Sequence, residues 1–139
     1  MGTNIRPEIS KKNRYWISKP RYYELKHFCL QYPSWRKAYS ELVEYGVSVS
    51  NITNEFRSTS ISDPTAKLAI LKMHCMERIE MIEEAALEAD KYLYKYIIKG
   101  VTEGRSYVYL KTKLDIPCSK DTYYDRYRKF FWILSHKRQ

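Results

Sequence analysis

The sequence predicts an all-α protein in which an N-terminal helical pair and a long central helix precede a C-terminal helix-turn-helix. Apolar residues recur every three or four positions through most of the chain, which is the period of an amphipathic helix. Only four glycines occur in 139 residues, and residues 65–89 contain neither glycine nor proline. Residues that favour helix starts, such as Asp63 before Pro64, stand at the beginnings of periodic segments.

The beginning of the chain is expected to be a basic, flexible arm. Residues 1–19 contain several cations and show no helical period. Within this arm, Tyr15, Trp16 and Ile17 are apolar enough to anchor it to the rest of the protein. We therefore predict an arm that is held at one point near its end.

Residues 20–46 predict a helical hairpin. Pro20 suits the first turn of a helix, Pro33 interrupts the apolar period, and Gly46 is a natural end for the second helix. Residues 47–62 are rich in Ser, Thr and Asn and have no sustained period, so we expect a linker there, with a short strand as the lesser alternative.

Residues 63–100 predict a long central helical segment that begins at Asp63 and Pro64 and ends at Gly100. Two apolar rows make its buried stripe wide. The first row contains Leu68, Leu71, Cys75, Ile79, Ile82 and Ala86, and the second contains Ala69, Met73 and Met76. The pattern allows either one continuous helix or a break near Asp90.

Residues 101–139 have the organisation of a helix-turn-helix. Ser106 can cap a short first helix, residues 115–118 are too few and too broken by Pro117 for anything but a tight connection, and Ser119 can cap the second helix. The second helix is expected to bury Tyr123, Tyr127, Phe130 and Leu134. Its opposite side is expected to present Lys120, Thr122, Tyr124, Asp125, Arg128 and Lys129.

The distribution of charge favours a polyanionic partner. The formal net charge is +9. Residues 1–37 carry nine Lys and Arg against two acids, residues 38–104 carry seven against eleven, and residues 105–139 carry nine against three. Basic ends around an acidic middle suit a surface that neutralises phosphates. The alternative is a solvated basic surface without a partner.

A helix of this kind can enter the major groove of double-stranded DNA, where its first residues reach base edges and its cations reach phosphates. We predict that Lys120, Thr122 and Tyr124 read bases, that Ser119 contacts phosphate at the helix end, and that Arg128 and Lys129 contact the backbone. The candidate DNA contacts also include Lys111, Lys113 and Arg105. Asp121 and Asp125 fit better as capping or salt-bridge residues, or as acceptors for cytosine.

The run SKDTYYDRYRKF resembles the recognition helix in region four of bacterial sigma factors and of phage regulators built on it, with Ser119, Lys120, Thr122 and Tyr124 on the matching positions. The order of segments, including the Tyr32-Pro33 break, is similar to that of phage late-gene activators of the RinA and ArpU type. This resemblance implies a phage or prophage promoter-binding protein that recruits host RNA polymerase. The sequence departs from the pattern in its longer DIPC turn and at Tyr123, where Val or Ile is usual.

Two further functions fit the pattern. The chain could be a helical protein-binding module, such as an inhibitor or adaptor of a host enzyme, or a DNA-packaging protein like the small subunit of phage terminase. The apolar stripe of the central helix could pack on the N-terminal helices or pair two copies into a homodimer whose recognition helices address successive DNA turns.

Catalysis, metal binding and membrane insertion are not expected. Cys29, Cys75 and Cys118 form no CxxC pair, and the histidines are scattered, so neither a zinc site nor another cofactor site is predicted. The chain has no phosphate-binding glycine loop and no nucleophile motif. The absence of these motifs leads us to expect a non-enzymatic protein. The chain also lacks an apolar segment of membrane-spanning length, so we expect it to be cytoplasmic.

Overall fold

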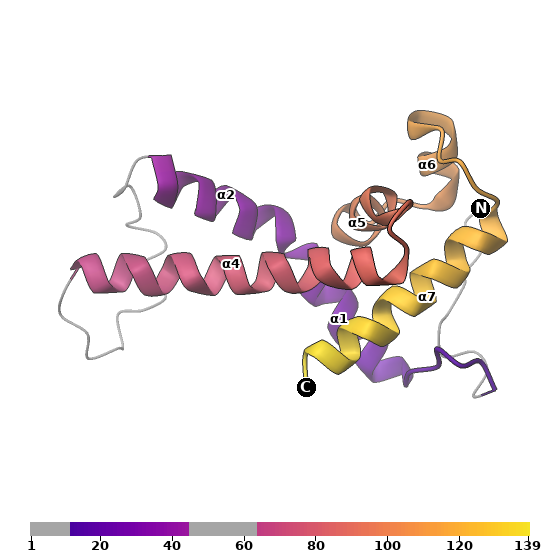
Figure 1. The fold of residues 1–139 in the computed structure, drawn as a ribbon, viewed down its shortest axis with the longest axis horizontal. Helices are drawn as coiled ribbons and strands as arrows, with labels where there is room; N and C mark the ends of the chain where they lie inside the picture. Colours follow the sequence, from indigo (N-terminus) through magenta and orange to yellow (C-terminus); the bar gives the residue numbers. More distant parts are fainter. Residues whose placement is uncertain (1–11, 45–63) are drawn as a thin grey trace. The chain divides into compact units, whose positions relative to one another are not determined.

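The computed structural model describes residues 12–44 and 64–139, and these residues form α-helices joined by turns (Figure 1). The helices are α1 (Lys19–Leu30), α2 (Tyr32–Glu44), α4 (Pro64–Ala89), α5 (Tyr94–Glu103), α6 (Tyr107–Leu114) and α7 (Lys120–Lys137). No residue of the two described ranges lies in a strand, which confirms the all-α prediction. The predicted linker, the cap Asp63 and the first part of the basic arm lie outside the described residues.

The chain divides into two compact units. The terminal unit consists of Met1–Gln31 and Met81–Gln139, and the central unit is Tyr32–Glu80. The division after Gln31 assigns α1 and α2 to different units, although the sequence predicts them as one hairpin. In the described ranges, no helix combines the length and the apolar character needed to cross a bilayer.

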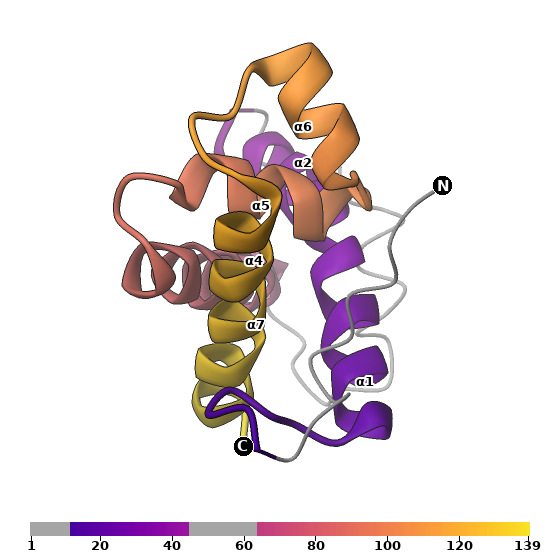
Figure 2. The ribbon, with the colours of Figure 1, turned by 90° about the vertical axis from the view of Figure 1, so that its right-hand side faces the viewer.

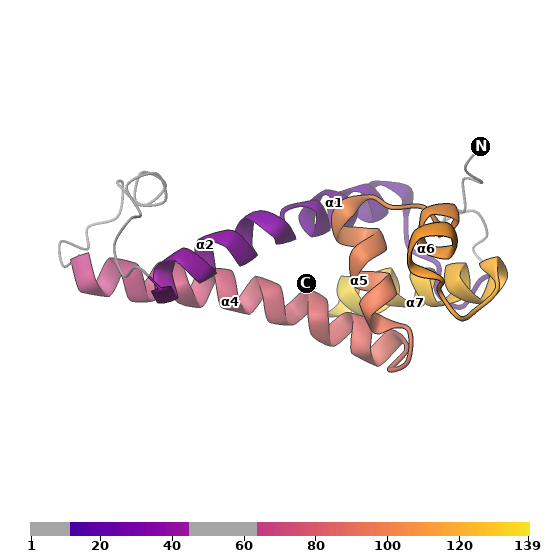
Figure 3. The ribbon, with the colours of Figure 1, turned by 90° about the horizontal axis from the view of Figure 1, so that it is seen from above.

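In the central unit, α2 runs alongside the first part of α4 (Figure 3). Leu42 from α2 and Leu71 from α4 are buried together, and Leu68 packs against them. The ammonium of Lys72 lies 5.9 Å from the centre of the Tyr39 ring, so a cation–π contact adds to this pairing.

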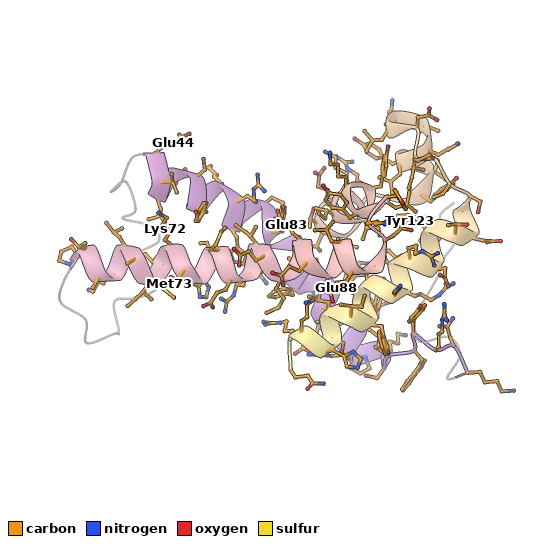
Figure 4. The ribbon with its side chains drawn as sticks, viewed as in Figure 1. Glu44, Lys72, Met73, Glu83, Glu88 and Tyr123 are labelled. Atoms are coloured by element: carbon orange, nitrogen blue, oxygen red, sulfur yellow. The ribbon has the colours of Figure 1, made fainter. Side chains whose placement is uncertain are left out.

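The wide apolar stripe predicted for α4 is only half correct. The first row is buried as expected from Leu71 to Ala86, and Leu68 is partly buried. In the second row, Ala69 is exposed and Met73 is 61% exposed. Figure 4 shows why, since Lys72 lies on the side of α4 that faces α2 and Met73 lies on the opposite side. A single neighbouring helix in this unit can cover only one row.

In the terminal unit, α1 and α7 lie side by side and α5 crosses near their upper ends (Figure 2). Aromatic rings fill the contact. Phe131 of α7 meets the ring of Tyr22 at a centroid distance of 5.1 Å and that of Tyr127 at 5.0 Å, both edge to face. The hydroxyls of Tyr22 and Tyr127 share a hydrogen bond of 2.5 Å. Large rings with one polar end therefore hold α1 on α7.

The predicted anchor of the N-terminal arm is present in the described residues. Tyr15 and Ile17 are buried, and the ring of Tyr15 packs edge to face on Trp132 of α7 at 5.7 Å. The Asn13 carboxamide accepts a hydrogen bond of 2.8 Å from the backbone N–H of Tyr15. The end of the arm is thus held against α7 through Tyr15.

Arg21 of α1 joins the end of α7. Its guanidinium donates hydrogen bonds to the Ser135 hydroxyl at 3.1 Å, to the Ser135 carbonyl at 2.9 Å and to the Arg138 carbonyl at 2.6 Å. It also forms an ion pair with Glu24. Carbonyls in the last turn of a helix have no partner within the helix, and a cation interacts favourably with the negative, C-terminal end of the helix dipole. Arg21 therefore supplies hydrogen bonds and positive charge to the C-terminal end of α7.

The helix is interrupted between α4 and α5 at Asp90. Of the two predicted arrangements, one continuous helix or a break near Asp90, the second is therefore correct. The Asp90 carboxylate accepts hydrogen bonds from the N–H groups of Tyr92 at 2.8 Å and Leu93 at 3.0 Å. Its other oxygen lies 3.1 Å from Nε of Arg126 on α7. Partial burial alone would raise the pKa of Asp90, but the two N–H groups and Arg126 outweigh it, and the pKa is lowered.

We expect the Asp90→Asn substitution to lower the free energy of unfolding by about 1 kcal/mol at pH 7, because the amide keeps the turn but loses the charge opposite Arg126. Since the folded-state pKa lies below the ordinary 3.8, this stabilisation is present above that pH and is lost as the pH falls through the folded-state value. Denaturant unfolding of both proteins between pH 2 and 7 measures the difference. A difference that stays constant to pH 2 would contradict the assignment, and Glu77→Gln is the exposed control.

The predicted end of the central segment at Gly100 is wrong. Helix α5 continues through Gly100 to Glu103 and ends at Gly104, which has a φ of 67°. This left-handed conformation favours glycine. Gly100 instead makes room, because a Cβ placed on it would lie 2.2 Å from the hydroxyl oxygen of Tyr123. Helix α7 therefore approaches α5 closely at this point.

Candidate nucleic-acid interface

The connection between α6 and α7 is a well-defined turn. The N–H groups of Asp115 and Ile116 both donate to the carbonyl of Leu110, and Asp115 has the left-handed φ of 52° that aspartate tolerates. Ile116 is fully buried. The hydroxyl of Tyr107 donates to the carbonyl of Cys118 at 2.6 Å. The unusual length of this turn is thus accommodated by burying its isoleucine and bonding its last carbonyl.

The start of α7 is capped as the sequence predicts. The Ser119 hydroxyl oxygen accepts a hydrogen bond of 3.2 Å from the N–H of Thr122, and the hydroxyl itself bonds the Thr122 hydroxyl at 3.0 Å. Both side chains are exposed, and Asp121 lies exposed in the same turn. The positive end of an 18-residue helix therefore faces solvent, as a phosphate-contacting helix end would.

The inner side of α7 also matches its prediction. Tyr123, Phe130 and Leu134 are buried, and Phe131 joins them, whereas the predicted Tyr127 is only partly buried. Tyr127 contacts Tyr22, and burial followed by this neighbour raises the pKa of Tyr127 well above its ordinary value. The Tyr127 hydroxyl therefore stays protonated at physiological pH.

Tyr124 lies on the flank of α7 and not on its outer side. Its hydroxyl accepts a hydrogen bond of 3.4 Å from the N–H of Tyr107, and its ring packs edge to face on Tyr123 at 5.0 Å. At about 100° per residue, Lys120 and Tyr124 share a row with Phe131 of the core. In this structure Tyr124 supports α6, and Lys120 lies half-buried beside it.

The outer side of α7 carries the candidate backbone contacts. Arg128 and Lys129 are both half-exposed. The Nε atom of Arg128 is buried and has no hydrogen-bond partner in the described part of the chain. Asp125, on the same side, forms an ion pair with Arg126, which is the salt-bridge role predicted for it. The acid nearest the two cations is therefore already paired within the protein.

The remaining candidate cations lie around α6. Arg105 precedes the helix, 3.6 Å from Glu103 and stacked at 4.4 Å over the ring of Tyr109. Lys111 faces the turn, with its ammonium 3.4 Å from the Ile116 carbonyl. Lys113 is exposed on α6. The structure brings Ser119 and Thr122 together at the N-terminal end of α7, and Arg128 and Lys129 lie farther along the same helix. Lys111 lies on α6, and its side chain contacts the turn.

Arg126 is the residue that sequence reasoning missed. It occupies neither the predicted inner nor the predicted outer face, yet its guanidinium joins Asp125 to Asp90, 36 positions earlier. The hydrogen bond to Asp90 is the largest cause of the raised pKa of Arg126. A contact across that sequence distance leaves no local pattern, so no motif could have identified it.

The thiols of Cys29 and Cys118 lie in surroundings that disfavour the thiolate. Burial raises the pKa of the Cys29 thiol, and partial burial with the nearby Asp90 raises that of Cys118, so both stay protonated. In residues 12–44 and 64–139, no three His, Cys, Asp or Glu side chains gather closely enough to hold a metal ion.

No protein-family model, curated protein or solved structure matches the chain. The likeness of the α7 sequence to sigma region four stays a prediction. The function proposed below is therefore argued from the geometry and charge of α6, the turn and α7.

Proposed function

We propose that the chain is a sequence-specific double-stranded DNA-binding transcriptional regulator, and that it acts as a phage or prophage late-gene activator through host RNA polymerase. The observation that carries the proposal is the exposed, capped start of α7, where Ser119 and Thr122 precede the outer cations Arg128 and Lys129. Helix N-terminal residues at base edges with cations on phosphates form the usual arrangement of a recognition helix.

The packing of α5, α6 and α7 supports the same proposal. Helix α5 contacts both α6 and α7, and three-helix units of this kind present their third helix to the major groove. We no longer propose Tyr124 as a base contact, because its hydroxyl accepts a hydrogen bond from α6 and its ring packs on Tyr123. Lys120 and Thr122 remain the proposed base contacts, and Tyr124 becomes the residue that sets the angle of α7.

Selection from randomised duplexes, followed by titration of the selected duplex at several salt concentrations, tests the proposal. We expect steep salt dependence, and for Lys120→Ala/Arg128→Ala/Lys129→Ala a slope of log affinity against log salt that is smaller by about 2, because Arg128 and Lys129 are the proposed phosphate contacts. Affinity at moderate salt should fall about a hundredfold. The control is Lys91→Ala/Lys95→Ala/Lys99→Ala, which removes three charges away from α7 and should leave DNA affinity close to that of the parent.

Two results would reject the DNA-binding function. One is a parent protein that ignores duplex DNA at low salt, which would favour the protein-binding module instead. The other is a triple α7 variant that binds as tightly as the parent. Light scattering during the titration gives the number of chains on each duplex, and a ring of many subunits would favour a DNA-packaging role over activation.

We further propose a homodimer through α4 in the central unit. Met73 is 61% exposed and Ile70 is 38% exposed on a helix whose other row is buried. Apolar side chains that a small unit leaves uncovered are candidates for pairing with a second copy. In that case the light-scattering titration should show two chains on each duplex.

A further inference from the structure

A surface pocket of about 650 Å³ lies between the start of α5 and the end of α6, apart from the proposed DNA contacts. It is lined by Lys91, Tyr92, Tyr94, Lys95, Tyr96, Lys99 and Leu114. Its lining includes no carboxylate and none of the candidate DNA-binding residues. The pocket therefore combines positive charge with an apolar surface that the proposed function does not use.

The three lysines of the pocket follow one another at every fourth position. Lys95 and Lys99 lie on one row of α5, and Lys91 lies in the turn just before it. Lys91 is 5.1 Å from the centre of the Tyr92 ring, and Lys99 pairs with Glu103 at 3.0 Å. Four-residue spacing places side chains along one side of a helix at intervals of about 6 Å. A partner with several carboxylates would meet the ammonium groups of Lys91 and Lys95 first, and would share that of Lys99 with Glu103.

The apolar part of the pocket is unusually open to solvent. Tyr92 is 79% exposed and Leu114 is 38% exposed. Tyr94 and Tyr96 are half-exposed beside them. Tyrosine is enriched in protein interfaces and in their energetically dominant centres. A leucine or aromatic side chain from a partner would cover this surface and bury it from water.

We infer that this pocket binds an acidic protein segment that carries a leucine or aromatic anchor. Charge complementarity identifies the acidic component, and Leu114 identifies the anchor. A DNA backbone brings phosphates but no apolar group, so it would leave Leu114 and the tyrosines uncovered. Unpaired bases could stack on Tyr92, but Leu114 has no ring face for stacking. A protein segment satisfies both halves of the pocket, and its binding is independent of DNA recognition by α7.

A display selection with random 12-residue peptides on the full-length protein tests the inference. We expect enriched peptides to carry two or more Asp or Glu close to a Leu, Phe or Trp. A synthetic, fluorescein-labelled copy of the most enriched peptide should lose affinity at least about tenfold on Lys91→Ala/Lys95→Ala/Lys99→Ala, because close charge pairs are removed. Leu114→Ala should weaken binding about fivefold, because the anchor loses its apolar contact.

The control is Lys120→Ala/Arg128→Ala/Lys129→Ala, which has the same loss of charge and should bind the peptide like the parent. Replacing the acidic residues of the peptide by Gln or Asn should lower its affinity for the parent protein as much as the pocket variant does. Selection of peptides without acids, no enrichment, or equal binding to the pocket variant would each overturn the inference. So would loss of affinity for a single-stranded or duplex oligonucleotide in the pocket variant with peptide binding unchanged, which would assign the pocket to nucleic acid.

Discussion

Gly100→Ala is expected to lower the free energy of unfolding by about 2 to 3 kcal/mol, the magnitude typical of overpacking a core. The added Cβ would lie 2.2 Å from the Tyr123 hydroxyl oxygen. Tyr123 is only 1% exposed and has Tyr107, Tyr124 and Tyr127 around its ring. Its hydroxyl therefore has little space to move away. Helix propensity alone gives the opposite expectation, because alanine is about 1 kcal/mol better than glycine inside a helix.

A double variant isolates the cause. The Tyr123 hydroxyl is buried and has no hydrogen-bond partner among the described residues, so Tyr123→Phe alone should be neutral or stabilising. In Gly100→Ala/Tyr123→Phe the nearest ring carbon would lie 3.5 Å from the new Cβ, which is ordinary contact. Most of the lost stability should return. Urea unfolding followed by near-UV circular dichroism measures all three variants, and a double variant no better than Gly100→Ala would disprove the steric explanation.

Arg21→Ala should lower the free energy of unfolding by about 2 to 3 kcal/mol, because hydrogen bonds from a charged donor contribute more than neutral ones. The substitution removes the donor of three hydrogen bonds to Ser135 and Arg138 and leaves carbonyls at the end of α7 without that partner. Arg21→Lys should recover only part of the loss, since an ammonium cannot reproduce the planar, forked geometry of the guanidinium.

The comparison requires a control of equal charge. Lys19→Ala changes an exposed cation two positions earlier on α1 and should alter stability by no more than about 0.5 kcal/mol. Thermal and urea unfolding both report the effect. A loss with Arg21→Ala as small as that with Lys19→Ala would show that the contacts to α7 contribute little.

The elements that the sequence predicted well are those fixed by neighbouring residues. Ser106 and Ser119 accept hydrogen bonds from the N–H groups of Tyr109 and Thr122, as helix caps. Periodicity identified Tyr123, Phe130 and Leu134 as buried for the same reason, since helical geometry alone places them on one side. These features need no knowledge of the rest of the fold.

The errors arise where another helix decides the outcome. Gly100 looked like a helix end, but it is the point at which α7 approaches α5. Met73 looked buried because it is apolar, but α2 covers the other side of α4. Tyr124 looked like a surface residue of α7 until α6 was placed beside it. In each case the deciding neighbour is distant in sequence, and its position cannot be read from local spacing.

The pairing of α1 with α7 has a consequence for how the protein is made. Arg21 and Tyr22 meet residues 105 to 117 positions later in the chain. During translation α1 leaves the ribosome long before its partner exists, and domains generally fold as units once their segments are available. The aromatic side of α1 must therefore stay exposed for most of synthesis.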